Sequence, residues 1–307
     1  EVTVQVASEF DDFRVGDDVD ITFDEDAFAI AVAQTDLESQ YQFSDFDRLN
    51  VLVVVLVVFV VAVVALGRWR GVSALVGLGL SLVIVIGWLL PSILDGRNPA
   101  WVAFVGASAV AFVALYVSHG VSLMTSSALI GTIAALGLTS LLSAFTIWAA
   151  NFTGLASEES TLLTLYSGID IRGLLLAGMV LGAAGALDDV TVTQAESVWQ
   201  LRRANRSASE TELRNSAMSI GRHHIGSTVN TLLLAYLGAS LPLAVLFVIA
   251  GQSFGTIANS EVVAVEIVRT LVGSLGLIAA VPVTTWLAAR IAASEAAEAR
   301  LGHDHEA

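Results

Sequence analysis

Two neighbouring aspartates end one of the apolar runs of this chain. Asp188 and Asp189 lie in the stretch GALDDVTVTQAESVW, directly after a run of small and aliphatic residues. If that run spans a membrane, a charge at its centre costs about 2.5–3.5 kcal/mol, and the cost falls toward the interface. The pair is therefore either a solvated end of a helix or a polar site at the mouth of the membrane domain, where it would bind a cation or a proton.

Two adjacent histidines open the next apolar run, GRHHIGSTVNTLLLAY. On a helix His223 and His224 point about 100° apart, so they cannot easily bind one metal ion together. One of them can face Asp188 or Asp189 if the two helices pack as neighbours, and a histidine beside a carboxylate titrates near neutral pH. The alternative is a histidine pair that faces water and lipid headgroups.

An asparagine lies deeper in the same run. Asn230 belongs to a polar patch with Ser227, Thr228 and Thr231. An amide is costly against lipid, so we expect Asn230 to face protein or a water-filled cavity. It would serve there as a contact between helices or as a contact to a substrate.

Small residues and prolines mark further positions in the apolar runs. Gly178 and Gly182 are four residues apart, and this spacing favours close packing of helices rather than chemistry. Pro242 and Pro282 are expected to kink their helices, although proline is ordinary in membrane spans.

Several classes of site are excluded. The chain has no cysteine, so disulfides and thiolate metal sites are ruled out. No HExxH, GxSxG or P-loop motif occurs. A paired-aspartate protease needs acids on two facing spans, and only one run ends in such a pair. We expect no catalytic residues, no cofactor, no metal site and no enzymatic activity.

The elements that carry these residues are membrane helices. The chain is 55% hydrophobic and 14% charged, whereas soluble domains carry about 25% charged residues. A spanning helix needs about 20 apolar residues, and the runs are apolar on all sides, unlike barrel strands. The sequence predicts an all-α integral membrane bundle with about seven transmembrane helices. The predicted spans are Leu49–Leu66, Val72–Leu90, Trp101–Val117, Val121–Trp148, Arg172–Leu187, Ile225–Ile249 and Val262–Ala289.

The first 48 residues form a separate acidic segment. They hold 14 acids and two arginines of a chain whose net charge is −15. Val2, Val4 and Val6, and then Val19, Ile21 and Phe23, alternate with polar residues, which predicts short strands. Because two or three strands do not form a stable core, we expect a small, truncated β-rich segment outside the membrane. No basic surface suits a nucleic acid, so none is expected as a partner.

The arginines set the predicted orientation. Nine of them fall in loops that are cytoplasmic if residues 1–48 are extracytoplasmic, and five fall on the other side. The chain is therefore expected to be a multi-pass protein of the cell membrane with a cytoplasmic tail over residues 291–307. Residues 188–224 are predicted to form a cytoplasmic loop with one or two helices on the membrane surface. Ser209 and Glu212 would form the capping box of one of them.

Several stretches, taken in order, resemble the YibE/F-like family of bacterial multi-pass membrane proteins. They are YQFSDFDRL, LLPSILDGRNP, GALDDVTVTQ, GRHHIGSTVNTLLLAYLGASLPL and EIVRTLVGSLGLIAAVPVTTWLAA, which together cover most of residues 41–290. The resemblance implies a further span ahead of residue 1 and a permease-like membrane protein. Its motif positions here include Asp188, Asp189, Gly221, Asn230 and Tyr236.

The expected function is transport of a small solute or ion. Asp188 or Asp189 would bind a coupling cation, and His223, His224, Asn230 and Tyr236 complete the proposed pathway. Helices with polar groups near the midplane are typical of transporters. The alternative is a scaffold or sensor that transports nothing and binds a membrane partner protein or a second copy of itself.

Overall fold

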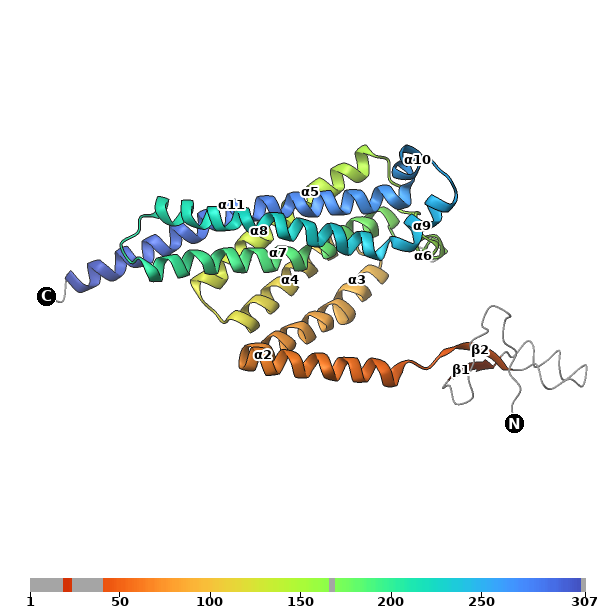
Figure 1. Cartoon of the computed structure of the whole chain (residues 1–307), viewed down its shortest axis with the longest axis horizontal. Coiled ribbons are helices and arrows are strands. Elements are labelled where there is room, and N and C mark those ends of the chain that lie inside the picture. Colours follow the sequence, from red (N-terminus) through yellow and green to blue (C-terminus); the bar gives the residue numbers. More distant parts are fainter. Residues whose placement is uncertain (1–18, 24–40, 166–168, 305–307) are drawn as a thin grey trace, which may run out of the picture. The chain divides into compact units, whose positions relative to one another are not determined.

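The computed structural model of the chain describes residues 19–23, 41–165 and 169–304 (Figure 1). These residues divide into two compact units, residues 1–71 and residues 72–307, and each is described by itself.

The first unit contains two strands and the start of a long helix. β1 (Val19–Phe23) pairs antiparallel with β2 (Tyr41–Phe46), and a register shift lies between Asp20 and Ile21. The alternating Val19, Ile21 and Phe23 thus lie in a strand. Val2–Val6 falls outside the described residues, and the β-rich character of the whole segment stays a prediction.

The helix α2 (Leu49–Ile84) contains the first predicted span and most of the second, which was predicted to end at Leu90. Arg68 interrupts it with φ 51° and ψ −131°, so two helical segments meet there at a kink. Arg68 lies in the short Arg-containing stretch that separates the two apolar runs in the sequence. A π-helical turn, η2 (Val85–Leu89), and the short α3 (Leu90–Leu94) follow, and Pro91 lies in the first turn of α3.

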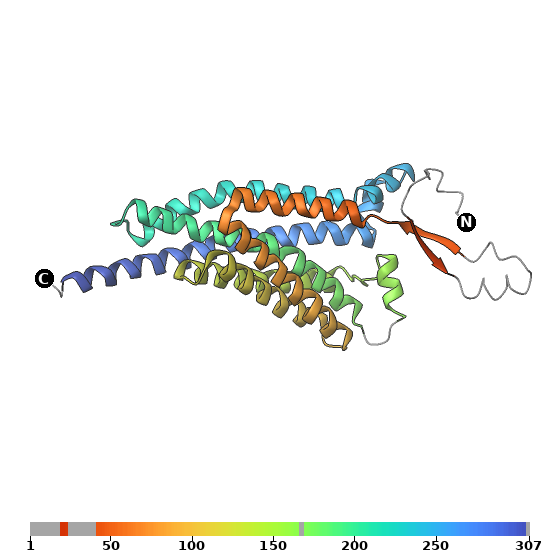
Figure 2. The same cartoon turned by 90° about the horizontal axis from the view of Figure 1, so that it is seen from below.

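Most of the second unit is a bundle of five long helices. They run side by side in Figures 1 and 2. They are α4 (Pro99–His119), α5 (Leu123–Ala149), α7 (Ile171–Ala204), α8 (Glu210–Ala239) and α11 (Glu261–Asp304). The short helices α6 (Glu158–Leu163), α9 (Leu241–Ile249) and α10 (Phe254–Asn259) connect them.

Side chains at the helix starts explain where the helices begin. Asn98, Ser122, Asp170 and Ser209 each accept a hydrogen bond from a backbone N–H in the first turn of the helix that follows. Such caps satisfy donors that the helix itself leaves free. Ser209 and Glu212 form the complete capping box that the sequence predicts.

The helices have the length and composition of membrane spans. Among the described residues, five are long and apolar enough to cross a membrane, and six if α8 and α9, which meet at 62°, form one broken span. The helical bundle agrees with the prediction, whereas the count of seven is not reached by this measure. One reason is that Leu49–Leu94 counts as a single candidate despite the kink at Arg68.

Most of residues 188–224, for which the sequence predicts a loop with one or two surface helices, belongs to the long helices α7 and α8. α7 continues past Asp188 and Asp189 to Ala204, and α8 begins at Glu210, so the connection is only Asn205–Ser209. The helical parts of residues 188–224 therefore continue the long helices α7 and α8 and are not separate helices on the membrane surface. The apolar run ends at these polar side chains, but the helix does not. Relative to alanine, Asp, Thr and Gln each lower the stability of a helix by about 0.7 kcal/mol or less, which is too little to end it.

The two prolines behave differently. Pro242 lies in the first turn of α9, two residues after Ser240, where the chain bends. Pro282 lies inside α11, which is assigned as one helix through that position. The predicted break therefore occurs at Pro242. The helix α11 reaches Asp304, and residues 305–307 lie outside the described residues.

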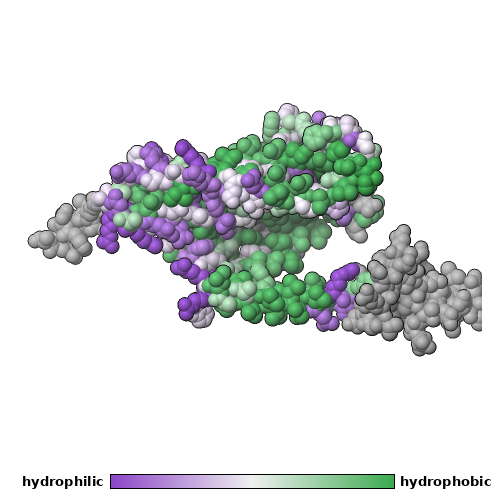
Figure 3. Space-filling model, in the orientation of Figure 1, coloured by the Kyte–Doolittle hydropathy of each residue, from purple (hydrophilic) through white to green (hydrophobic). Residues whose placement is uncertain are grey.

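The core of the bundle lies between α4, α5, α7 and α11. Its buried side chains include Ala107, Leu136, Val180, Leu187 and Val281. A second cluster, rich in alanine, holds the end where α7 joins α8 and includes Ala195, Ala217 and Ala288. Figure 3 shows hydrophilic residues gathered at that end and hydrophobic residues over most of the remaining bundle surface.

Candidate functional site

Asp188 and Asp189 have different surroundings although they are neighbours. Asp189 is exposed, whereas Asp188 is half-buried and its Oδ1 is fully buried. Leu181 and Val192, seven residues before and four after Asp188, pack against residues of α3, α4 and α5. Residues at these spacings share a helix face, so Asp188 faces the α4 side of α7.

The histidines do not join this carboxylate. His223 is exposed, and His224 is half-buried on α8 with a buried Nε2. Neither Asp188 Oδ1 nor His224 Nε2 has a hydrogen-bond partner within the described parts of the chain. α7 and α8 are neighbours, as Gln194 shows below, but Asp188 lies on another face of α7.

The Asn230 side chain is exposed in the single chain, so it does not pack against another helix there, and its expected place in a water-filled cavity stays a prediction. Leu232, two residues later, packs against the core. Residues two apart on a helix point about 200° apart, so Asn230 lies on the outward face of α8.

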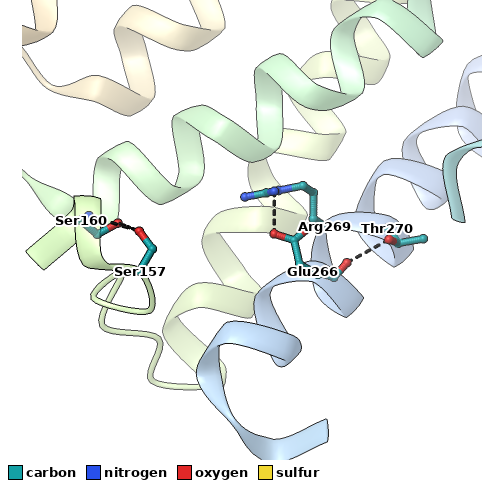
Figure 4. A network of polar contacts seen from close by, with 5 residues as sticks. All are labelled: Ser157, Ser160, Glu266, Arg269 and Thr270. Atoms are coloured by element: carbon teal, nitrogen blue, oxygen red, sulfur yellow. Dashed lines mark hydrogen bonds and ion pairs between the residues drawn. The ribbon is translucent and has the colours of Figure 1, made fainter. Parts of the chain in front are cut away.

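Tyr236 lies in a cluster with Arg269 and Glu266, two residues that the sequence did not predict to join it. Arg269 lies over the ring of Tyr236, with 5.9 Å from the guanidinium carbon to the ring centroid. Arg269 Nη1 also donates to Glu266 Oε1 at 2.8 Å, and the two side chains are 25% and 26% exposed. Figure 4 shows this ion pair one turn apart on α11.

The glycines of α7 lie beneath these polar side chains. A Cβ built on Gly182 would be 2.9 Å from the Tyr236 hydroxyl, and one on Gly178 would be 3.9 Å from Arg269 Nη2. The spacing was predicted to allow close packing of helices. It instead leaves room on α7 for a tyrosine from α8 and an arginine from α11.

A second polar region lies inside the bundle, between α5, α7, α8 and α11. Thr132 and Thr191 share a hydrogen bond of 2.6 Å between their hydroxyls. Gln194 Nε2 donates to the Ala217 carbonyl oxygen at 2.8 Å and to Thr285 Oγ1 at 2.6 Å. These bonds fix α7 against three neighbouring helices.

Other buried hydroxyls have no such partner. They are 7% exposed or less and have no hydrogen bond among the residues that the structure describes: Thr139, Ser143, Ser274 and Thr284. Most lone hydroxyls in helices donate to a carbonyl one turn earlier, as those of Ser140 and Thr146 do here. Buried polar groups are normally paired, so these four unpaired hydroxyls on α5 and α11 are unusual.

The helices lie close together along this row. A Cβ on Gly131 would collide with the Thr284 hydroxyl, and one on Gly276 would collide with the Thr139 hydroxyl. The hydroxyls of Thr139 and Thr284 therefore each contact a glycine of the facing helix, at the contact between α5 and α11.

One carboxylate, that of Glu261 at the start of α11, has a structural role. Glu261, the first residue of α11, accepts hydrogen bonds from the backbone N–H groups of Thr153 and Gly154 at 2.8 and 2.7 Å. Thr153 Oγ1 adds a third bond at 2.8 Å. A cavity of about 430 Å³ adjoins this contact and is lined by residues that include Asn151 and Asn259.

Glu266, Arg269, Gln194 and the buried hydroxyls were not among the residues predicted from the sequence. One signal was available: an arginine and a glutamate three apart inside an apolar run are rare in a span and mark a functional site. The sequence pattern used Arg269 only as one of the arginines that predict the orientation of the chain in the membrane. The hydroxyls carry no such signal, since Ser and Thr are common in membrane helices.

The comparisons with known proteins agree with the resemblance found in the sequence. A search of curated proteins and a search of solved structures each give no match. The family model described as YibE/F-like protein matches residues 55–294, more than three quarters of the chain. The matched region includes both polar regions and the long helices of the bundle, α11 as far as residue 294. The chain therefore belongs to the YibE/F-like protein family.

Proposed function

We propose that this membrane protein is a permease that moves a small solute or ion through the bundle formed by α4, α5, α7, α8 and α11. The observation that carries the proposal is the row of buried hydroxyls without partners between α5 and α11, together with the buried Asp188 Oδ1. A bundle that served only as an anchor in lipid would gain nothing from these groups, because each unpaired buried polar group costs about 1–3 kcal/mol.

The topology of the proposal has seven crossings. Arg68 divides α2 into two spans, and the bent pair of α8 and α9 is one broken span. The Arg-rich α7–α8 connection would be cytoplasmic, as would the C-terminus, and residues 1–48 would be extracytoplasmic. The basic residues near the connection, Arg202, Arg203 and Arg206, favour this orientation.

Asp188 would bind the coupling cation or proton. Its carboxylate is the buried one of the pair, and Thr191, one turn later, links α7 to α5 through Thr132. Asp189 is exposed and would have no part in binding. An acid within a span that faces other helices is the usual position of a coupling site.

The test uses purified protein in lipid vesicles that enclose a pH-sensitive dye, with an imposed proton or sodium gradient. Replacing Asp188 by Asn should reduce flux at least about tenfold, which corresponds to about 1.4 kcal/mol. Asp189→Asn is the matched control and should leave flux within about twofold. Equal losses in both variants, or no flux above empty vesicles, would reject the assignment.

Thr139 tests the row itself. Thr139→Val keeps the shape of the side chain and removes the hydroxyl, and should slow flux without lowering the yield of folded protein. Ser140→Ala is its control, because the Ser140 hydroxyl already donates to its own helix at 2.8 Å.

A further inference from the structure

The outward face of α8 carries polar side chains within the region proposed to cross the membrane. His223, Ser227, Asn230, Leu234 and Leu237 are all exposed, and they recur every three or four residues. Residues at these spacings share one side of a helix. They therefore form a continuous line, here called the α8 stripe, with Asn230 in its middle.

The bundle does not use the α8 stripe for its own packing. A Cβ on Gly221 would meet Gln194 and Val281, and Ile225 packs against the core. Gly221 lies nine residues before Asn230, which is half a turn around the helix. The α8 stripe is therefore on the side opposite to the contacts with α7 and α11.

Asn230 is the member of the α8 stripe that lipid cannot satisfy. The hydroxyls of Thr228 and Thr231 donate to carbonyl oxygens of their own helix at 3.1 and 3.0 Å. No hydrogen bond of the Asn230 side chain is found among the residues that the structure describes. Asn230 lies ten residues, about 15 Å, before the bend at Ser240, so it is well inside the broken span. An amide at this depth needs a polar partner, because acyl chains neither donate nor accept hydrogen bonds.

A second copy of the chain supplies that partner. An amide both donates and accepts, so two asparagine side chains can bond to each other. In a two-fold symmetric pair the same surface of each copy meets itself, and copies inserted in one direction have parallel α8 helices. The two Asn230 side chains would then meet, as single polar residues do in the seam of parallel helix pairs.

Other surroundings match the α8 stripe less well. Within the first segment of α2, Leu49–Leu66, the only polar residue is Asn50, at its start. That segment offers no partner to an amide in the middle of a span. The other half of the α8 stripe suits a helix that packs along its whole length, since Leu234 and Leu237 are 63% and 51% exposed.

We propose that the α8 stripe is the contact between two copies of this chain, with the Asn230 amides bonded to each other across the two-fold axis. That α8 crosses the membrane rests on the topology proposed above. Transport is not required, because the contact can form in a protein that moves no solute.

Disulfide crosslinking tests the contact directly. The chain has no cysteine, so a single introduced cysteine joins two copies only through that position. The test is made in the membranes of the expressing cells, where all copies have one orientation. Ser227→Cys and Asn230→Cys should give a band of twice the mass of the chain on oxidation. Ala235→Cys is the matched control and should give little, since Ala235 is also exposed but lies about 140° from Asn230 around the helix.

Two variants assign the contact to the amide. Asn230→Leu should lower the association constant of labelled copies in lipid vesicles about fivefold, as the loss of one hydrogen bond between helices predicts. Asn230→Gln keeps an amide and should retain most of the association. Thr231→Val is the control and should change nothing, because the Thr231 hydroxyl already donates to the Ser227 carbonyl oxygen at 3.0 Å. Energy transfer between the labelled copies measures the association.

Equal crosslinking at positions 230 and 235, or association that Asn230→Leu does not weaken, would overturn the proposal. Two other results would also overturn it. A disulfide within one chain that carries both Leu56→Cys and Asn230→Cys would identify the first segment of α2 as the neighbour. Reaction of Asn230→Cys with a water-soluble maleimide, without crosslinked dimer, would identify water.

The contact and the transport function can fail separately. If Asn230→Leu does not fold, the crosslinking of Ser227→Cys against Ala235→Cys decides. Crosslinked dimers without flux in vesicles support the contact and reject transport. Flux by a protein that stays monomeric in the same vesicles does the reverse.

Discussion

The two ends of the bundle are built differently. At the α7–α8 end, the buried residues of the alanine-rich cluster interlock, and Gln194 bonds α7 to α8 and α11. At the other end, α9 and α10 contain no buried residue, and cavities of about 430 and 890 Å³ lie against α10 and the start of α11. The α7–α8 end, here called the tight end, is therefore closed by buried contacts. At the other end, here called the loose end, the short helices are uncovered, although Phe152 and Val265 are buried beside them.

The difference matters for a permease. Alternating access needs one part of a bundle to move against another around a binding site. The bend at Ser240 and the Tyr236–Arg269 cluster belong to the loose end, whereas Gln194 belongs to the tight end. We expect the two ends to differ in rigidity as they differ in packing.

Gly221 should be the most sensitive position at the tight end. A Cβ there would lie 2.6 Å from Val281 Cγ1 and 2.7 Å from Gln194 Oε1, and both side chains are buried. Gly221→Val should therefore destabilise the protein by about 3 kcal/mol, measured as a fall in the thermal midpoint in detergent. Gly226→Val is the control, because nothing lies within 4 Å of its Cβ position. Equal midpoints for the two variants would contradict the packing.

Gln194 should rank second. Gln194→Leu keeps much of the volume and leaves Ala217 and Thr285 without their donor, at a cost of about 2 kcal/mol. Gln200 lies on the same helix, is exposed, and bonds only to Glu196 at 3.1 Å. Gln200→Leu should leave the midpoint unchanged. A loss that is no greater for Gln194 would mean that the bridge between the helices adds no rigidity.

Glu261 tests the loose end. Glu261→Gln replaces a charged acceptor of three hydrogen bonds by a neutral one, and should weaken this contact by about 1.5 kcal/mol. The effect should be local, with faster hydrogen exchange at the amides of Thr153 and Gly154 and no change near Gln194. Glu159→Gln, in the exposed α6, is the control. Faster exchange throughout the bundle would show that the two ends do not move independently.

Part of this comparison could be predicted from the sequence. The apolar runs locate the helices, and Ser209 with Glu212 marks the start of α8, because both signals are local. The extension of α7 through Asp188 is not local: its polar residues are buried or exposed according to which neighbour each face meets. The same reason separates Asp188 from Asp189, and it places Asn230 outward and Tyr236 against Arg269. Which side of a helix packs against its neighbours cannot be deduced from a run that is apolar on all sides.

Ser209 should give the smallest effect. Its hydroxyl accepts the Glu212 N–H at 3.2 Å, and the Glu212 carboxylate accepts the Ser209 N–H at 2.7 Å. Ser209→Ala removes the first of these and should cost about 1 kcal/mol, seen as faster exchange over residues 210–213. Ser209→Thr keeps the cap and is the control. Leu213 and Ala217 are buried in the alanine-rich cluster just beyond. If the tight end is rigid, fraying must stop at Leu213. Fraying that reached Gly221 would show that the cap, rather than the packed alanines, holds this end together.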